Sequence, residues 1–183
     1  RSWVDFCAGH LPKSLFHPLG KSFPADVGSM VEERDPIVLL VEGSRLDEAL
    51  RMLVRIGLDD VRGWFDAPTL DEYRRNGGTL ATSDEIGIVE GESRFSAPDS
   101  FLLDVRRADE FAAGAIPGAR QISHTRLRAH LKELPKDRHI YVHCRSGQRS
   151  ARAVALLERH GFTATNLGGG FLAWQKGAAA APR

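Results

Sequence analysis

The sequence predicts an α/β fold built as two domains, each of them a parallel sheet flanked by helices. Short apolar runs, such as IVLLV at 37–41 and HIYVH at 139–143, alternate with segments of helical pattern. Strands that alternate with helices over short connections form parallel sheets covered by helices. In addition, the same order of motifs occurs twice along the chain, about 100 residues apart.

The internal repeat extends over most of the chain. It pairs FCAGHLPKSL (6–15) with FAAGAIPGAR (111–120), PIVLLV (36–41) with HIYVHC (139–144), and EALRMLVRIG (48–57) with RAVALLERHG (152–161). The offset changes by only a few residues from pair to pair, as small loop insertions would cause. Two homologous domains explain this order better than chance periodicity does.

The repeat also sets the domain boundaries. We assign residues 1–80 to the first domain and 99–183 to the second, with 81–98, rich in Gly, Ser, Thr and acidic residues, as the linker. Arg1 corresponds to Arg106, so the strand FLLDV before Arg106 has no counterpart in the first copy. We therefore expect the first domain to lack its opening strand and the chain to be a fragment of a longer protein.

The second copy shows the expected elements in order. The apolar run FLLDV predicts a strand at 101–105, and ARQIS (119–123), HIYVH (139–143) and TATNL (163–167) are read as the further strands. Helices are predicted at 108–113, 125–134, 150–161 and 171–176. Pro135 ends the second of these helices. Ser150 is suited to cap the third, and Gly161 to terminate it. The β-branched and aromatic run HIYVH predicts a central strand.

Composition narrows the functional classes. Lys and Arg number 25 against 24 Asp and Glu, and this net charge of +1 argues against nucleic acid or a membrane surface as the main partner. No apolar run is long enough for a membrane span, and no signal peptide is visible. The only cysteines, Cys7 and Cys144, predict a reducing, cytoplasmic location without structural disulfides. Without HxH or HExxH spacing, we expect no metal and no cofactor.

The stretch HCRSGQRS at 143–150 contains a candidate nucleophile and a candidate anion-binding loop. Cys144 lies between a predicted strand and a predicted helix, where open parallel sheets bind their ligands. The small residues Ser146 and Gly147 let backbone N–H groups converge on an anion, and Arg145 and Arg149 add positive charge. Such surroundings lower the pKa of a thiol and make it a nucleophile. The alternative is that Cys144 is merely the last core residue of its strand.

Four motifs of the second copy, taken in order, resemble the rhodanese family. They are LLDVRRADEF (102–111), AGAIPGARQIS (113–123), HCRSGQRSARA (143–153) and NLGGGFLAW (166–174). The resemblance covers about residues 100–177. One departure is Ala115, where the family usually has histidine; that position is structural, so we do not read the change as a loss of activity.

The resemblance implies a thiosulfate or persulfide sulfurtransferase. Cys144 would take sulfane sulfur from thiosulfate or a low-molecular-weight persulfide, hold it as a persulfide, and pass it to a thiol or cyanide acceptor. The substrate-binding residues would be Arg145, Ser146, Gly147, Gln148, Arg149 and Ser150, whose N–H groups stabilise the persulfide and whose arginines attract the donor. Asp104 and Arg106 would orient the loop through an ion pair, with Asp104 paired to a loop arginine. Phe171 and Trp174 would pack beneath the site.

The first copy resembles a degenerate rhodanese domain. Val41 stands where Cys144 stands in the second copy, so we expect no persulfide and no catalysis there. Cys7 corresponds to Ala112, away from the loop, and is interpreted as a structural thiol. The alternative function for the pair is a non-catalytic docking or regulatory module of a larger persulfide-metabolising enzyme.

An inactive domain followed by an active one is similar to the C-terminal part of fusion proteins that begin with a metallo-β-lactamase-fold persulfide dioxygenase. The resemblance implies such an upstream domain as a partner in a longer chain. None of that domain's metal-binding motif occurs in this sequence.

Rhodanese-like folds also include phosphatases and arsenate reductases, which place the loop arginine one position later. Here that position holds Ser150, and the arginine is Arg149, five residues after Cys144. A shorter loop favours a single sulfur atom over a tetrahedral phosphate, and no general acid for an alkoxide leaving group is apparent. We therefore expect sulfur transfer. His143 is interpreted as an inward-facing strand residue rather than a base.

Overall fold

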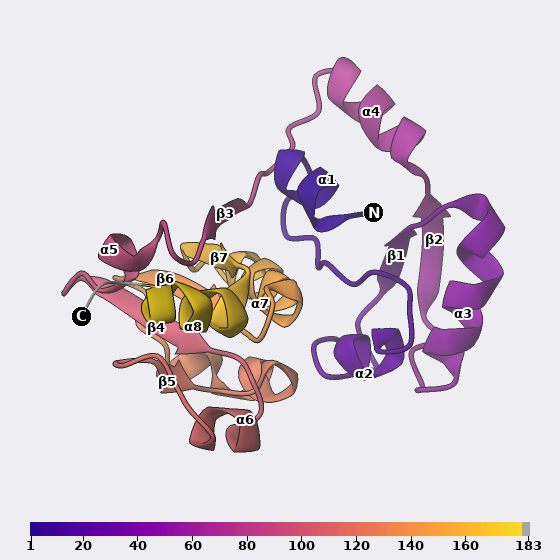
Figure 1. The fold of residues 1–183 in the computed structure, drawn as a ribbon. Coiled ribbons are helices and arrows are strands. Elements are labelled where there is room, and N and C mark those ends of the chain that lie inside the picture. Colours follow the sequence, from indigo (N-terminus) through magenta and orange to yellow (C-terminus); the bar gives the residue numbers. More distant parts are fainter. Residues whose placement is uncertain (181–183) are drawn as a thin grey trace. The chain divides into compact units, whose positions relative to one another are not determined.

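The computed structural model describes residues 1–180 of the chain and divides into two compact units (Figure 1). The first unit comprises Arg1–Pro12 and His17–Ala81, whereas the second begins at Thr82 and also includes Lys13–Phe16. Among the described residues, no helix combines the length and the apolar character needed to cross a bilayer.

The first unit contains a two-stranded parallel sheet with helices around it. Its elements are α1 (Trp3–Ala8), α2 (Phe23–Gly28), β1 (Ile37–Leu40), the 3-10 turn η1 (Gly43–Arg45), α3 (Leu46–Val54), β2 (Val61–Phe65) and α4 (Ala67–Arg75). Phe23 and Val27 of α2 pack with Leu53 of α3 and with Leu58 in a small core. The predicted strand at 37–41 and the helix before Gly57 are both present.

The second unit is built on a five-stranded sheet in which every strand pair is parallel. Its elements are β3 (Asp84–Gly87), α5 (Glu92–Phe95), β4 (Ser100–Asp104), α6 (Ala108–Ala112), β5 (Arg120–Gln121), η2 (His124–Glu133), β6 (His139–His143), α7 (Gln148–Arg159), β7 (Ala164–Gly168) and α8 (Gly170–Ala180). The strand order is β3-β7-β6-β4-β5, so β6 is central, as its β-branched and aromatic sequence predicts.

Helices cover both faces of this sheet. Leu102 of β4 and Leu167 of β7 lie in a buried cluster with Phe95 of α5 and Phe171 of α8. Successive side chains of a strand point to opposite faces, so the fully buried Leu103 points the other way. On that side α7 contacts β6, β7 and the 3-10 segment η2. Figure 1 shows α8 lying across the sheet of this unit.

Residues 81–98 do not form the linker that their composition predicts. Strand β3 pairs in parallel with β7, from Asp84 beside Thr165 to Gly87 beside Gly168, and α5 follows it. Ile88 and Phe95 from this range are buried in the core of the second unit. The strand is short and polar because it forms the edge of the sheet, where exposed acidic side chains discourage further strand pairing.

Three boundaries in the second copy also differ from prediction. Residues 124–133 form 3-10 rather than α-helix, and β5 has only two residues. Helix α7 begins at Gln148, and its N-terminal cap is Gly147, so Ser150 is a buried residue of the first turn and not the cap. Local sequence does not reveal this because the loop backbone is fixed by contacts with β7 and α8.

Glu158 of α7 makes a pH-dependent contact with the start of β3. The Ser83 hydroxyl donates a hydrogen bond of 2.6 Å to its Oε2. Burial raises the pKa of Glu158 to about 7, the Ser83 hydrogen bond opposes that rise, and the negative charge of Asp84 adds to it. In the unfolded chain this carboxyl titrates near its ordinary value of 4.5. The folded state therefore binds more protons between these two values, and stability falls as pH rises through that window.

We expect the unfolding temperature to fall between about pH 5 and pH 8, because Glu158 must ionise in a partly buried position next to Asp84. Glu158→Gln copies the neutral form and should remove most of this fall. Thermal denaturation followed by circular dichroism across that range measures the effect. Glu90→Gln, at an exposed position, is the matched control. An unchanged pH slope in Glu158→Gln would contradict the assignment.

Candidate active site

Cys144 lies directly after the central strand β6, at the carboxyl edge of the sheet. The three residues 145–147 connect it to α7, which begins at Gln148. In an open parallel sheet this edge is where ligands bind, because loops and helix N-termini converge there. The thiol is buried, with 1% of the residue exposed.

The sulfur of Cys144 receives several hydrogen bonds from its own loop. The backbone N–H of Gly147 donates to Sγ at 3.2 Å, and the Ser150 hydroxyl lies 3.5 Å from Sγ and 3.0 Å from the Gly147 carbonyl oxygen. Burial raises the pKa of Cys144, but hydrogen bonds from the Ser150 hydroxyl and from the N–H groups of Ser150, Ser146 and Gly147 outweigh it. The net result is a pKa below the ordinary value of a thiol. The site thus favours a negatively charged sulfur in a buried position.

Glycines hold the loop in this shape. Gly147 has a φ of 101°, a left-handed conformation that side chains other than glycine rarely adopt. A Cβ atom on Gly170 would lie 2.5 Å from the Cys144 carbonyl oxygen. That close approach lets the Phe171 N–H donate a 2.8 Å hydrogen bond to the same carbonyl. The glycine turn between β7 and α8 therefore holds the loop through backbone hydrogen bonds from the start of α8.

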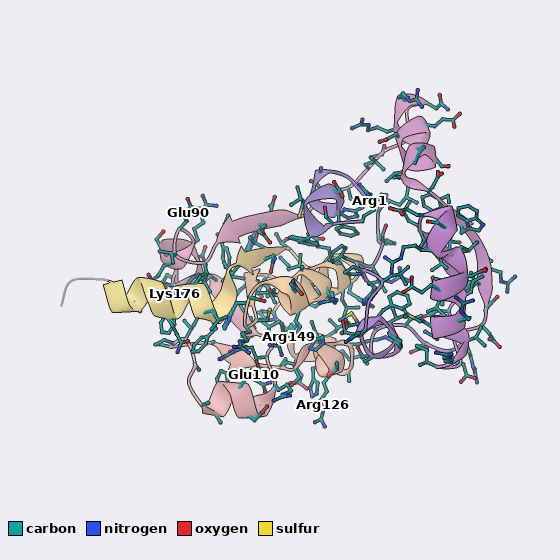
Figure 2. All side chains as sticks on the ribbon, turned by 45° about the vertical axis from the view of Figure 1, so that its right-hand side comes forward. Arg1, Glu90, Glu110, Arg126, Arg149 and Lys176 are labelled. Atoms are coloured by element: carbon teal, nitrogen blue, oxygen red, sulfur yellow. The ribbon has the colours of Figure 1, made fainter. Side chains whose placement is uncertain are left out.

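Arg149 in the first turn of α7 pairs with Glu110 of α6. Its Nη1 is 2.7 Å from Oε2 and its Nη2 is 2.8 Å from Oε1, so the guanidinium and the carboxylate meet through two parallel hydrogen bonds. Figure 2 labels both residues. The hydrogen bonds from Arg149 lower the pKa of Glu110 to about 2, although partial burial opposes the shift. The expectation that Asp104 pairs with a loop arginine is therefore wrong: Glu110 takes this place.

Asp104 pairs instead with Arg106, two residues along the chain. Arg106 Nη2 is 2.6 Å from Asp104 Oδ2, and both side chains are almost completely buried. The guanidinium also donates to the Glu110 and Gly114 carbonyls, at 3.2 and 2.8 Å, and its Cζ lies 3.8 Å from the centre of the Phe171 ring. The pair thus joins β4, α6 and α8 beneath the loop.

The remaining loop residues contribute mainly through the backbone. The side chains of Arg145, Ser146 and Gln148 are exposed, which leaves Arg145 at the surface beside the loop. His143 is fully buried, with Nδ1 3.4 Å from the Cys144 carbonyl and Nε2 3.6 Å from Asp104. Burial lowers the pKa of His143, although the charge of Asp104 opposes the shift, and so favours the neutral ring. Phe171 is buried and stacks with Trp174, which is half-buried.

Two residues of the site, Glu110 and Asn166, are not among those that the sequence predicts. Glu110 belongs to the DVRRADEF stretch, where it reads as an ordinary acidic residue of a helix N-terminus. Asn166 of β7 donates from Nδ2 to the Gly147 carbonyl at 3.3 Å and also to Glu85 of β3. Neither contact is visible in one sequence, because the partners lie far apart in the chain.

Within residues 1–180, no cluster of His, Cys, Asp and Glu has the size needed to hold a metal ion.

We expect Ser150→Ala to raise the pKa of Cys144, because the thiolate loses the hydroxyl hydrogen bond that favours its charged form. Alkylation of Cys144 by iodoacetamide at neutral pH should slow several-fold. The rate is measured by mass spectrometry of the peptide that contains Cys144. Ser146→Ala keeps its backbone N–H and should alkylate at the wild-type rate; equal slowing in both variants would contradict this role of Ser150.

We expect Asp104→Asn to lower the free energy of unfolding by about 3–5 kcal/mol, because it leaves the Arg106 guanidinium buried without its counter-ion. Chemical denaturation measures the change. Asp109→Asn, in α6, removes the carboxylate of an exposed ion pair with Arg107. This substitution should change the free energy of unfolding little. Similar effects of the two substitutions would show that the buried pair has no special structural role.

The geometry agrees with comparisons to known proteins. Residues 90–177 match the rhodanese-like domain family. A sulfurtransferase of Allochromatium vinosum is 40% identical over 79 residues, which are 43% of this chain and 74% of that protein. The thiosulfate:glutathione sulfurtransferase of Homo sapiens is 31% identical over 110 residues, 52% of this chain and 96% of that protein.

Among solved structures, reduced Bacillus anthracis CoADR-RHD is similar with a TM-score of 0.50 and 30% identity. This similarity covers 53% of this chain but only 17% of that protein. The resemblance drawn from the four motifs of the second copy is thereby confirmed, whereas the tandem arrangement and the fusion parent stay predictions. The chain belongs to the rhodanese-like domain family, whose matching members include sulfurtransferases.

Proposed function

We propose that the second unit transfers sulfane sulfur through a persulfide on Cys144. The observation that supports this most directly is the environment of Sγ: a buried thiol that accepts hydrogen bonds from the Gly147 N–H and the Ser150 hydroxyl. A sulfur atom with a net negative charge and a dry surrounding is suited to attack, and then to hold, a second sulfur atom.

The reaction needs no added oxidant, reductant or metal. The Cys144 thiolate attacks the outer sulfur of thiosulfate, a new S–S bond forms, and sulfite leaves with the electron pair of the broken S–S bond. An acceptor thiolate or cyanide then attacks the terminal sulfur of the persulfide. The Cys144 thiolate leaves in turn and is regenerated. The loop N–H groups stabilise the negative sulfur in each state.

Thiosulfate as donor and glutathione as acceptor are the proposed substrates. The human relative is named as a thiosulfate:glutathione sulfurtransferase, and the exposed Arg145 is placed to attract an anion. A low-molecular-weight persulfide is the alternative donor, with cyanide as a convenient acceptor in the assay. The proposed location is the cytoplasm, where thiols remain reduced.

For the first unit we propose a non-catalytic docking or supporting role. Val41, which corresponds to Cys144, follows β1 and donates its backbone N–H to the Phe65 carbonyl. It offers no thiol, and Cys7 lies on α1, outside the equivalent loop. An upstream metallo-β-lactamase-fold domain that supplies persulfide remains a prediction.

We expect Cys144→Ser to abolish thiocyanate release from thiosulfate and cyanide, because a hydroxyl neither ionises near neutral pH nor carries sulfane sulfur. After thiosulfate treatment, intact mass should show wild-type protein heavier by one sulfur atom and Cys144→Ser unchanged. Cys7→Ser is the matched control and should retain both signals.

The same preparations should be tested with a phosphate ester. Faster turnover of the ester than of thiosulfate would overturn the sulfur assignment. A wild-type protein that gains no sulfur would favour the docking role for both units.

A further inference from the structure

The carbonyl oxygen of Gly147 has three hydrogen-bond donors around it. They are the Ala151 N–H at 3.0 Å, the Ser150 hydroxyl at 3.0 Å and Asn166 Nδ2 at 3.3 Å. A carbonyl oxygen has only two lone pairs. The Ala151 N–H stays on this oxygen, because the carbonyl of the N-cap residue accepts the first hydrogen bond of the helix α7. The two side chains therefore compete for the second lone pair.

The Ser150 hydroxyl can leave this carbonyl because a second acceptor is within its reach. It lies 3.5 Å from Sγ of Cys144 as well as 3.0 Å from the Gly147 oxygen. A hydroxyl carries one hydrogen, so it donates to one of these two acceptors at a time. A sulfur that bears negative charge accepts a hydrogen bond more strongly than a neutral one. The hydroxyl therefore serves the sulfur when another donor satisfies the carbonyl.

Asn166 is the side chain that can take the place of the hydroxyl at the carbonyl. The residue is completely buried on β7, and its Nδ2 donates both to the Gly147 carbonyl and to the Glu85 carboxylate. Its Oδ1 is also buried and has no hydrogen-bond partner within residues 1–180. Buried polar atoms are seldom left unpaired. The amide is thus kept in this position by the two hydrogen bonds that it donates, although its oxygen stays unpaired.

Glu85 of β3 determines which end of the amide faces the loop. It is the direct partner of Asn166 in the parallel pairing of β3 with β7. The adjacent Gly168 allows this approach, because a Cβ atom there would lie 3.2 Å from the Glu85 carboxylate. A carboxylate only accepts hydrogen bonds, so the amide turns its NH2 group rather than its oxygen toward Glu85. The second hydrogen of the same NH2 group is then available to the Gly147 carbonyl.

We propose that Asn166 is a positioning residue that directs the Ser150 hydroxyl to the sulfur of Cys144. Held in place by Glu85, it satisfies the Gly147 carbonyl, which the hydroxyl would otherwise serve. Burial raises the pKa of Cys144, and the Ser150 hydroxyl contributes most among the hydrogen bonds that lower it. Asn166 therefore acts on the reactivity of the thiol without touching it. The inference rests on the proposed function only for turnover, because the reactivity of a thiol can be measured without any sulfur transfer.

Asn166→Leu removes the donor with little change in side-chain volume. The Ser150 hydroxyl should then remain on the Gly147 carbonyl, so we expect the pH profile of Cys144 alkylation by iodoacetamide to move to higher pH. The rate at neutral pH should fall about 3- to 10-fold. This slowing should not exceed that of Ser150→Ala, because Asn166 acts only through the hydroxyl.

Neighbouring substitutions separate this role from a general weakening of β7. Thr165→Val removes the hydrogen bond between Thr165 and His139 of β6 and should leave the profile unchanged; slowing equal to that of Asn166→Leu would overturn the proposal. Glu85→Ala, at an exposed position, removes the acceptor that orients the amide and should slow alkylation about twofold. Glu85→Gln keeps an acceptor oxygen and should not. The Glu85 variants keep the test decisive if Asn166→Leu does not fold by circular dichroism.

A double variant tests whether Asn166 acts through the Ser150 hydroxyl. In a Ser150→Ala background, Asn166→Leu should cause no further slowing, since the group that it directs is gone. Additive slowing, an unchanged profile in folded Asn166→Leu, or equal rates in Glu85→Ala and Glu85→Gln would overturn the proposal. The peptide containing Cys144 is quantified by mass spectrometry separately from that of Cys7.

Turnover supplies the second readout. For thiosulfate and cyanide, Asn166→Leu should lower kcat about 3- to 10-fold with KM within about twofold, because the exposed Arg145 is unchanged. A raised KM with kcat kept would overturn the proposal. If wild-type protein transfers no sulfur, the proposed function fails, but the alkylation profiles still decide the role of Asn166.

Discussion

The buried ion pair between Asp104 and Arg106 is the interaction on which the site depends. Asp104 ends β4, and Arg106 reaches from it to two carbonyls of the α6 region and to the face of Phe171 on α8. Phe171 in turn donates its N–H to the Cys144 carbonyl. A buried charge pair is costly to desolvate and weakly stabilising overall, but removing one partner is severe. The pair therefore fixes one arrangement of three elements around the loop.

Burial and hydrogen bonding have opposite effects on the charge of Cys144. Burial by itself disfavours a thiolate, yet reactivity toward sulfur requires one. The loop resolves this by directing N–H groups and a hydroxyl at a single atom. That convergence demands a left-handed Gly147 and a turn with no side chain at Gly170. The glycines of the loop and of the closing turn are thus required by the sulfur's hydrogen bonds.

Much of the second unit could be predicted from sequence, because its signals are local. FLLDV at 101–105 is apolar, HIYVH at 139–143 is β-branched and aromatic, and all four strands expected between 101 and 167 are present, although β5 is shorter than expected. Strand β3 could not be predicted from the sequence, because a short edge strand with acidic side chains resembles a loop in composition. The 3-10 form of 124–133 was hidden as well, because its apolar residues recur at a spacing that both helix types accommodate.

The sequence alone determined the parallel α/β fold of the second unit, and it drew attention to Cys144 and the loop that follows it. These follow from residue types at fixed short spacings, which constrain the backbone and the chemistry directly. Only the tertiary structure decided which polar and charged groups pair. It paired Arg149 with Glu110, reserved Asp104 for Arg106, and brought Asn166 to the Gly147 carbonyl. Each of these contacts involves a side chain whose chemistry permits several partners, and the choice among them is made by which elements the sheet places side by side.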